Sequence, residues 1–286
     1  MSLTFDDGPY EYTRQLLDTL DDYGVKATFF IAGNNRGKGG IDGDGNDWKS
    51  VLRRMHSAGH QLASHTWTHR NLNEVNRSVQ KSEVIYNEMA FRNIFGWFPT
   101  YIRAPYLECS ASSGCTDLLN TLGYHIIDSN IDTKDYENDN PELIKNSRDR
   151  FIAGVSSDAR SHGYIVLAHD VHYQTVVSLA PFMIEKAREL GYRLVTVGEC
   201  LGDPKENWYR QASGGSGTGA SHEDTTMVTS RANPSNTTKP SDGGAPSGTM
   251  TTSYAKPSKT GMVSKDKRCG GEQGQTCQFH LGSGAF

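Results

Sequence analysis

The sequence has no run of apolar residues that approaches the roughly 20 needed for a membrane-spanning helix, so no membrane span is predicted. It also has no excess of positive charge. Of its 29 basic and 33 acidic residues, 7 and 5 lie from residue 211 onward, which leaves 22 and 28 in residues 1–210. A weakly acidic domain without a basic stripe binds a phosphate backbone poorly, which argues against a nucleic-acid partner.

Large apolar residues are almost absent between Gln211 and about Arg268, where Ser, Thr, Gly, Pro and Lys dominate. Such a segment cannot bury enough surface to offset its ordering entropy. We therefore expect one folded domain over residues 1–210, a disordered and glycosylated linker over 211–268, and a short separate segment over 269–286.

Cysteine is scarce, with five residues in the chain, and no signal peptide is visible. Cys109 and Cys115 close a short loop, and we expect a local disulfide between them. Asn76-Arg77-Ser78 and Asn236-Thr237-Thr238 are N-glycosylation acceptors in a secreted chain. Either the protein is intracellular or this sequence lacks its natural start, and the cysteines and acceptors favour the second alternative.

Short apolar runs alternate with amphipathic segments along the first 200 residues. Strand followed by helix, repeated six or seven times, predicts an α/β fold with a parallel sheet, either a distorted or incomplete (β/α) barrel or a doubly wound open sheet. The barrel, followed by a disordered tail, is the predicted fold class. The expected strands are 3–5, 27–32, 61–64, 101–104, 125–128, 164–168 and 193–197. The expected helices are 12–23, 48–57, 73–95, 116–122, 141–153 and 176–190, most of them followed by a glycine stop.

Ionisable side chains follow five of these strands, at the edge where parallel α/β folds carry their functional residues. Each pair alone has an ordinary explanation as a turn, a surface residue or a structural hydrogen bond. A complete set at consecutive strand ends instead indicates a site. Its members are Asp6 and Asp7, His65 and His69, Arg103 and Tyr106, Asp132 and Asp135, and His169 and Asp170.

Two histidines and one carboxylate are a frequent ligand set for zinc or another divalent metal with open positions for water and substrate. Such an ion lowers the pKa of bound water to roughly 7 and polarises a carbonyl oxygen. A second carboxylate can act as the base and a histidine across the site as the acid. The sequence therefore predicts hydrolysis of an amide or an ester.

Five ordered motifs resemble those of the polysaccharide deacetylases with a NodB-homology domain (carbohydrate esterase family 4). They are Thr4-Phe5-Asp6-Asp7-Gly8, His65-Thr66-Trp67-Thr68-His69, Arg103-Ala104-Pro105-Tyr106, Asp132-Thr133-Lys134-Asp135-Tyr136 and Leu167-Ala168-His169-Asp170. Residues 29–38, 64–72 and 198–210 further resemble fungal chitin deacetylases. The resemblance implies one divalent metal ion bound by Asp7, His65 and His69, with zinc expected and cobalt or nickel as alternatives.

The resemblance also implies the role of each remaining site residue. Asp6 would be the general base and Arg103 would orient it. The backbone N–H of Tyr106 would stabilise the oxyanion. His169 would protonate the departing amine, held by Asp135.

Substrate contacts follow from the same resemblance. Leu167 would line the pocket for the acetyl methyl group. Trp67, Tyr106 and Tyr136 would line a sugar groove, with Tyr136 where many relatives have Trp; a core position is the alternative for Trp67. The implied substrate is chitin or a chitooligosaccharide, with peptidoglycan or acetylxylan as alternatives, and the implied location is secreted or in the cell wall. Nothing in the sequence suggests an obligate assembly, so a monomer is expected.

Two departures from the family pattern concern the ends of the chain. Relatives usually have more chain before the first motif, so we expect the first strand to be a stub, with Asp6 and Asp7 prone to fraying. The run from Arg268 to Cys277 resembles the start of a hevein-like chitin-binding module, which would be incomplete. The alternative to an active enzyme is therefore a truncated carbohydrate-binding remnant.

Overall fold

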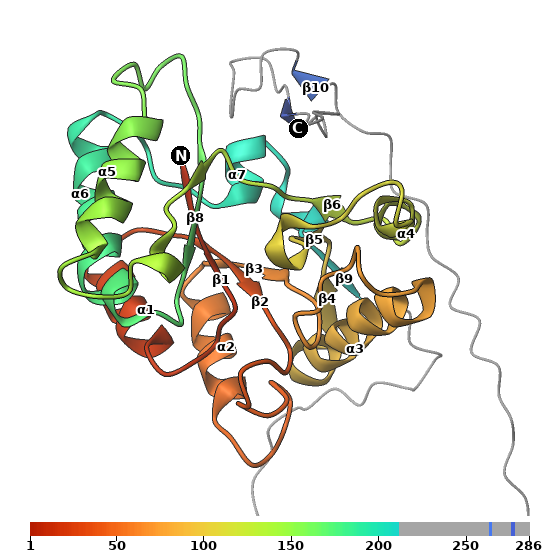
Figure 1. Ribbon diagram of the computed structural model, residues 1–286. Coiled ribbons are helices and arrows are strands. Elements are labelled where there is room, and N and C mark those ends of the chain that lie inside the picture. Colours follow the sequence, from red (N-terminus) through yellow and green to blue (C-terminus); the bar gives the residue numbers. More distant parts are fainter. Residues whose placement is uncertain (212–262, 265–275, 278–286) are drawn as a thin grey trace, which may run out of the picture. The chain divides into compact units, whose positions relative to one another are not determined.

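A parallel seven-stranded sheet forms the centre of the computed structural model, which describes residues 1–211, 263–264 and 276–277 (Figure 1). The strand order is β6-β5-β3-β2-β1-β8-β7, and the sheet curls into a half barrel. The strands are β1 (Ser2–Asp6), β2 (Thr28–Ile31), β3 (Gln61–Ser64), β5 (Tyr101–Ile102), β6 (His125–Ile126), β7 (Ile131–Asp132) and β8 (Ile165–His169). The incomplete barrel is thereby confirmed.

Helices connect the strands and cover the sheet. They are α1 (Thr13–Asp22), α2 (Trp48–Ser57), α3 (Arg77–Phe95), α4 (Cys115–Thr121), α5 (Ile144–Gly154), α6 (Ala180–Glu189) and α7 (Val197–Leu201). A π-helical turn, η3 (Thr175–Leu179), leads into α6, and the short turns η1 (Pro105–Leu107), η2 (Asp135–Glu137) and η4 (Lys205–Asn207) lie in connections. In Figure 1, α1, α5 and α6 lie at the left of the sheet and α3 and α4 at its right. Residues of α1, α2, α3 and α6 share one core cluster with the central strands.

The first strand lies in the middle of the sheet, and all five of its residues are buried. It pairs with β2 from Thr4 to Asp6 and with β8 from Ser2 to Asp6. Phe5 is fully buried, and a side chain of this kind contributes about 1.5–3 kcal/mol on burial. The expectation of a frayed stub is therefore wrong, because neighbours on both sides hold the strand.

The sequence misplaced one element. The expected strand at 193–197 is wrong, since the backbone turns into α7 at Val197. Thr196 accepts a hydrogen bond from the Glu199 backbone while the Glu199 side chain accepts one from the Thr196 backbone, a capping box that starts a helix. Similarly, α3 begins at Arg77 because the side chain of Asn76 caps it.

The predicted disulfide between Cys109 and Cys115 is confirmed, with the two Cα atoms 5.1 Å apart. A two-stranded antiparallel pair, β4 (Trp97–Pro99) with β9 (Tyr209–Gln211), was missed because each strand has only three residues. None of the described helices is both long and apolar enough to cross a membrane.

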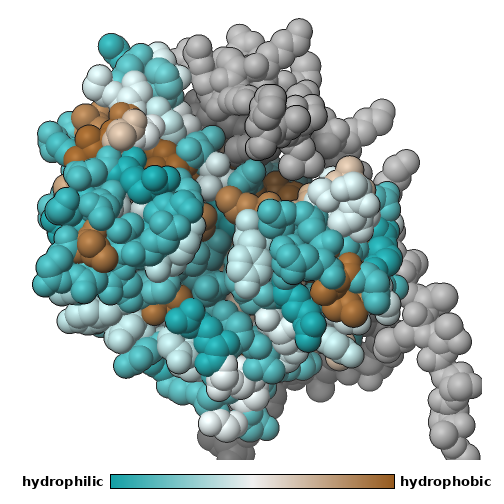
Figure 2. All heavy atoms as spheres, in the orientation of Figure 1, coloured by the Kyte–Doolittle hydropathy of each residue, from teal (hydrophilic) through white to brown (hydrophobic). Residues whose placement is uncertain are grey.

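The predicted linker over 211–268 and the segment over 269–286 lie outside the described residues, apart from Gln211 and two short strands. These are β10 (Val263–Ser264) and β11 (Thr276–Cys277), which pair in parallel. On the described surface seen in Figure 2, hydrophilic residues predominate and apolar patches are small and separate.

Candidate active site

The reactive side chains converge because their strands are neighbours in the sheet. Asp6 is the last residue of β1 and His169 the last residue of β8, and the two are paired across the strands. His65 follows β3 directly. The carboxyl ends of parallel strands meet at one edge, so Asp6, His65 and His169 share it.

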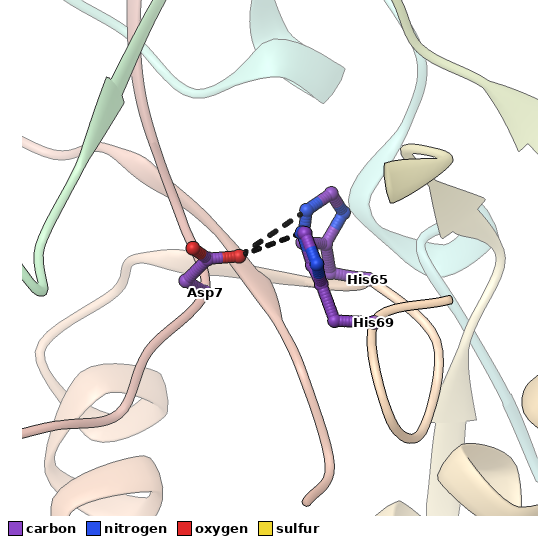
Figure 3. Close-up of side chains that lie close together, drawn as sticks. All are labelled: Asp7, His65 and His69. Carbon is purple, nitrogen blue, oxygen red and sulfur yellow. Dashed lines mark ion pairs between the residues drawn. The ribbon is translucent and has the colours of Figure 1, made fainter. Parts of the chain in front are cut away.

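Three potential metal ligands meet at this edge (Figure 3). The Oδ1 atom of Asp7 lies 3.0 Å from Nε2 of His69 and 3.5 Å from Nε2 of His65. One donor atom from each residue falls within 4.8 Å of the other two. The set predicted from the sequence is thus brought together by the fold.

The protonation states of these groups suit a cation. Nδ1 of His65 donates to the backbone oxygen of Arg103 at 2.8 Å, which leaves the Nε2 lone pair facing Asp7. Burial lowers the pKa of His65 to about 4 despite the nearby Asp6, so the ring is neutral at neutral pH. Burial would raise the pKa of Asp7, but the contact with His69 and the charges of both metal-site histidines hold it well below its usual value.

Oδ1 of Asp7 is buried and has no hydrogen-bond donor in suitable geometry. A buried acceptor left unpaired costs about 1–3 kcal/mol, whereas a divalent cation at this point would satisfy it. A carboxylate with two imidazoles is a donor set suited to zinc, cobalt or nickel. The residues present therefore fit a divalent metal ion.

The backbone around these groups is strained. Asp7 (φ 78°), Thr66 (φ 67°), His69 (φ 59°) and Tyr106 (φ 60°) all adopt left-handed conformations without being glycine. Each such residue costs of the order of 1–3 kcal/mol and persists only where surrounding contacts hold it. Strained backbone conformations of this kind cluster at functional sites. No pattern in the sequence predicts the left-handed conformations of these four residues.

Asp6 and Arg103 form a buried ion pair beside the metal-ligand candidates. Nη1 of the fully buried Arg103 lies 2.8 Å from Oδ1 of Asp6 and also donates to Oγ1 of Thr4 at 2.7 Å. Nη2 donates to the backbone oxygen of Asp128 at 3.1 Å. Oδ2 of Asp6 remains directed at the site, 3.8 Å from Nε2 of His65. Thr4 was not predicted as a partner, because a threonine inside a strand carries no signal for it.

His169 and Asp135 form the second charged pair. Oδ1 of Asp135 lies 2.8 Å from Nδ1 of His169, and Oδ2 accepts from the His169 backbone and from Thr175 Oγ1, each at 2.7 Å. Burial alone would lower the pKa of His169, but Asp135, reinforced by Asp6 and Asp7, raises it to about 10. The imidazole is therefore protonated at neutral pH and faces the carboxylates.

Two of the predicted groove residues flank these groups. Tyr106 is 64% exposed, and its ring stands edge-on to His69 with centroids 4.8 Å apart. Tyr136 is 43% exposed, and its ring stands edge-on to His169 with centroids 5.3 Å apart. Leu167 is buried within β8, two residues before His169.

Trp67 packs differently. Its ring lies against the loop after β2, where a Cβ added to Gly33 would approach it to 2.1 Å. Its other ring contact is with Tyr86, at 6.5 Å between centroids. The structure thus gives Trp67 a packing role, and its contact with a sugar stays a prediction.

The two remaining acidic residues of the predicted set, Asp132 and Asp170, accept hydrogen bonds from neighbouring protein groups. Asp132 accepts from the Lys134 backbone at 2.9 Å. Asp170 is fully buried, accepts from Oγ1 of Thr13 at 2.5 Å, and leaves no space for a side chain at Gly8. Burial raises the pKa of Asp170 to about 6.

Known proteins resemble this chain over the described core. The sequence profile described as polysaccharide deacetylase matches residues 1–127. The chain is 49% identical over 210 residues to a chitin deacetylase from Colletotrichum lindemuthianum, covering 73% of this chain and 82% of that protein. It is 44% identical over 214 residues to a chitin deacetylase from Pestalotiopsis sp., covering 75% of this chain and 67% of that protein.

The fold is similar as well. The solved structure of the chitin deacetylase from Colletotrichum lindemuthianum superposes with a TM-score of 0.70 at 48% identity. The match covers 73% of this chain and 90% of that one.

Proposed function

The chain belongs to the polysaccharide deacetylase family, and we propose that it hydrolyses the N-acetyl groups of chitin or chitooligosaccharides with the help of one divalent metal ion. The observation that carries the proposal is the convergence of Asp7, His65 and His69 within 4.8 Å of one another. The Asp6–Arg103 pair and the His169–Asp135 pair border this centre. The two similar chitin deacetylases support the substrate class.

Asp7, His65 and His69 would hold the metal ion, expected to be zinc. When bound, it would supply Lewis acidity that polarises the acetyl carbonyl and lowers the pKa of water. Asp6 accepts the proton of the attacking water through Oδ2, the oxygen that faces His65. Arg103 keeps the other oxygen of Asp6 in place.

His169 donates a proton to the amide nitrogen as the C–N bond breaks. The products are acetate and a glucosamine unit with a free amine. Asp135 holds the ring through Nδ1, so Nε2 is the atom left to carry the transferred proton. Tyr106, at a positive φ of 60°, offers its backbone N–H to the developing oxyanion.

The exposed rings of Tyr106 and Tyr136 lie on the two sides of the reacting groups and offer apolar faces to neighbouring sugar rings. Leu167, buried at the end of β8, is proposed to contact the acetyl methyl group. The sugar groove therefore follows the line from His69 to His169.

The disulfide between Cys109 and Cys115 supports a proposed location outside the cytosol, because disulfides persist in oxidising compartments. The acceptor Asn76 is exposed, so a glycan could be attached there.

The function is tested by acetate release from chitin pentamer by the purified full chain with added zinc. We expect release from the pentamer and less from peptidoglycan or acetylxylan. A folded, zinc-binding sample that releases acetate from none of these polymers would contradict the proposal and favour the remnant. Preference for peptidoglycan or acetylxylan would correct the substrate class alone.

Replacing Asp135 with asparagine is expected to move the alkaline limb of the kcat–pH profile to lower pH. His169 must be protonated to act as the acid, so activity falls as pH rises through its pKa, which Asp135 helps to raise to about 10. Without the charge of Asp135, burial lowers the pKa of His169, and activity is lost at a lower pH than in the parent. The neighbouring pair of His172 and Asp139 provides the control, since Nδ1 of His172 lies 3.2 Å from Asp139. Asp139→Asn should leave the limb in place, and an unchanged limb in Asp135→Asn would contradict the assignment.

A further inference from the structure

Two side chains from the loop between β2 and α2 donate to a single backbone oxygen, that of Asp7. Nδ2 of Asn35 lies 3.1 Å from it and Nζ of Lys38 lies 3.2 Å from it. A carbonyl oxygen has two lone pairs, so these two donors occupy both. We refer to Asn35 and Lys38 as the Asp7 clamp.

The loop that carries the Asp7 clamp is also bound to the turn between the two metal-site histidines. The backbone N–H groups of Gly33 and Asn34 donate to the backbone oxygens of Thr66 and Trp67, at 3.0 and 2.6 Å. The close approach of Trp67 leaves no space for a side chain at Gly33. One loop therefore ties together the two segments that supply the metal ligands.

Both of these segments are strained where the ligands leave the backbone. Asp7 has φ 78° and His69 has φ 59°, conformations that cost of the order of 1–3 kcal/mol each in a residue with a side chain. The φ of Asp7 sets the direction of its Cβ and hence of its carboxylate. Hydrogen bonds to the carbonyl of Asp7 oppose relaxation of that backbone.

The side chain of Lys38 also points inward. Its neighbours Arg36 and Gly37 are exposed, yet Lys38 is half-buried and turns its Nζ to the Asp7 backbone. Ordering a lysine side chain costs up to about 2 kcal/mol in rotamer entropy, so its placement calls for compensating contacts. The hydrogen bond to the backbone oxygen of Asp7 is such a contact.

We propose that Lys38 and Asn35 are positioning residues of the metal centre, which hold Asp7 in its left-handed conformation so that its carboxylate meets His65 and His69. This inference rests on the proposed function in that Asp7 is taken as a metal ligand. Neither residue touches the reacting atoms, and both act through Asp7.

The test is the zinc dissociation constant of the full chain, measured by competition with a chelator, for Lys38→Met and Asn35→Leu. Each substitution removes the donor and keeps much of the side-chain volume. We expect zinc binding to weaken by about 10- to 100-fold in each variant, the usual effect of losing a partner that orients a ligand. The melting temperature of the metal-free protein should change little, and the visible spectrum of the cobalt form should shift because one ligand is reoriented.

Lys49→Met is the matched control, because Lys49 stands at the start of α2 and pairs with the exposed Asp44 at 2.5 Å. It should bind zinc as the parent does. Wild-type zinc affinity in both clamp variants, or an equal loss in Lys49→Met, would overturn the proposal. If Lys38→Met does not fold, Asn35→Leu decides alone. A parent chain that binds zinc but releases no acetate would contradict the proposed function. The zinc affinities of the variants would still test whether Asn35 and Lys38 position Asp7.

Discussion

Replacing Asp6 with asparagine is expected to lower kcat on chitin pentamer by about 10²- to 10⁴-fold, the range lost with a general base. Asparagine keeps the shape of the side chain and can still accept from Nη1 of Arg103, which now lies 2.8 Å from Asp6. What it loses is the negative oxygen that would take a proton from water. Because Asp6 is not among the three metal-ligand candidates, zinc affinity should stay within a few-fold of the parent value.

This variant also removes the counter-charge of a fully buried arginine, which lowers the free energy of unfolding. Circular dichroism at the assay temperature must therefore accompany the kinetics. Asp44→Asn, whose side chain is 98% exposed, is the control for the chemical change and should be neutral. Parent-like acetate release by a folded Asp6→Asn protein would rule out Asp6 as the base. A hundredfold loss of zinc affinity would place Asp6 in the metal shell instead.

Removal of the metal by dialysis against a chelator is expected to abolish acetate release, and zinc or cobalt should restore it. At a zinc concentration 1,000 times Kd, binding to the folded state adds about 4 kcal/mol to its stability. For a domain of about 200 residues this corresponds to a rise in Tm of about 8–16 °C. Acetate release and a thermal melt with and without zinc measure the two effects separately.

The rise in Tm on addition of zinc should depend on Asp7, His65 and His69. In His65→Ala, zinc should raise Tm far less than in the parent. His162→Ala removes an exposed histidine and should respond to zinc like the parent. Full activity of a protein shown by elemental analysis to be metal-free would refute metal dependence.

The sequence was sufficient for six of the seven strands of the sheet and for the convergence of charged groups, for a definite physical reason. Asp6, His65 and His169 lie at strand ends, and parallel pairing brings such ends to one edge whatever the loops do. The same logic fails for residues that act from a loop. Lys38 and Asn35 lie in a glycine-rich connection with no periodicity, so only the folded structure shows that both reach the carbonyl of Asp7.

Competition between strand propensity and helix capping explains the misplaced strand, and short length explains the missed strands β4, β7 and β9. Val195-Thr196-Val197 has the β-branched composition of a strand, but the capping box between Thr196 and Glu199 favours a helix start. β7 has two residues, Ile131 and Asp132, too few for alternation to be visible. The left-handed conformations of Asp7 and His69 were likewise unreadable, since tertiary contacts impose them.

Asp6 and His169 are cross-strand partners at the ends of β1 and β8. The spacing between the proposed proton acceptor and proton donor is therefore set by the hydrogen-bonding ladder of a sheet, in which neighbouring strands lie about 4.8 Å apart. Connections around the groove can lengthen, shorten or change composition without altering that spacing. Evolution could thus exchange one acetylated polymer for another by rebuilding loops alone, with the proton-transfer geometry inherited intact from the backbone.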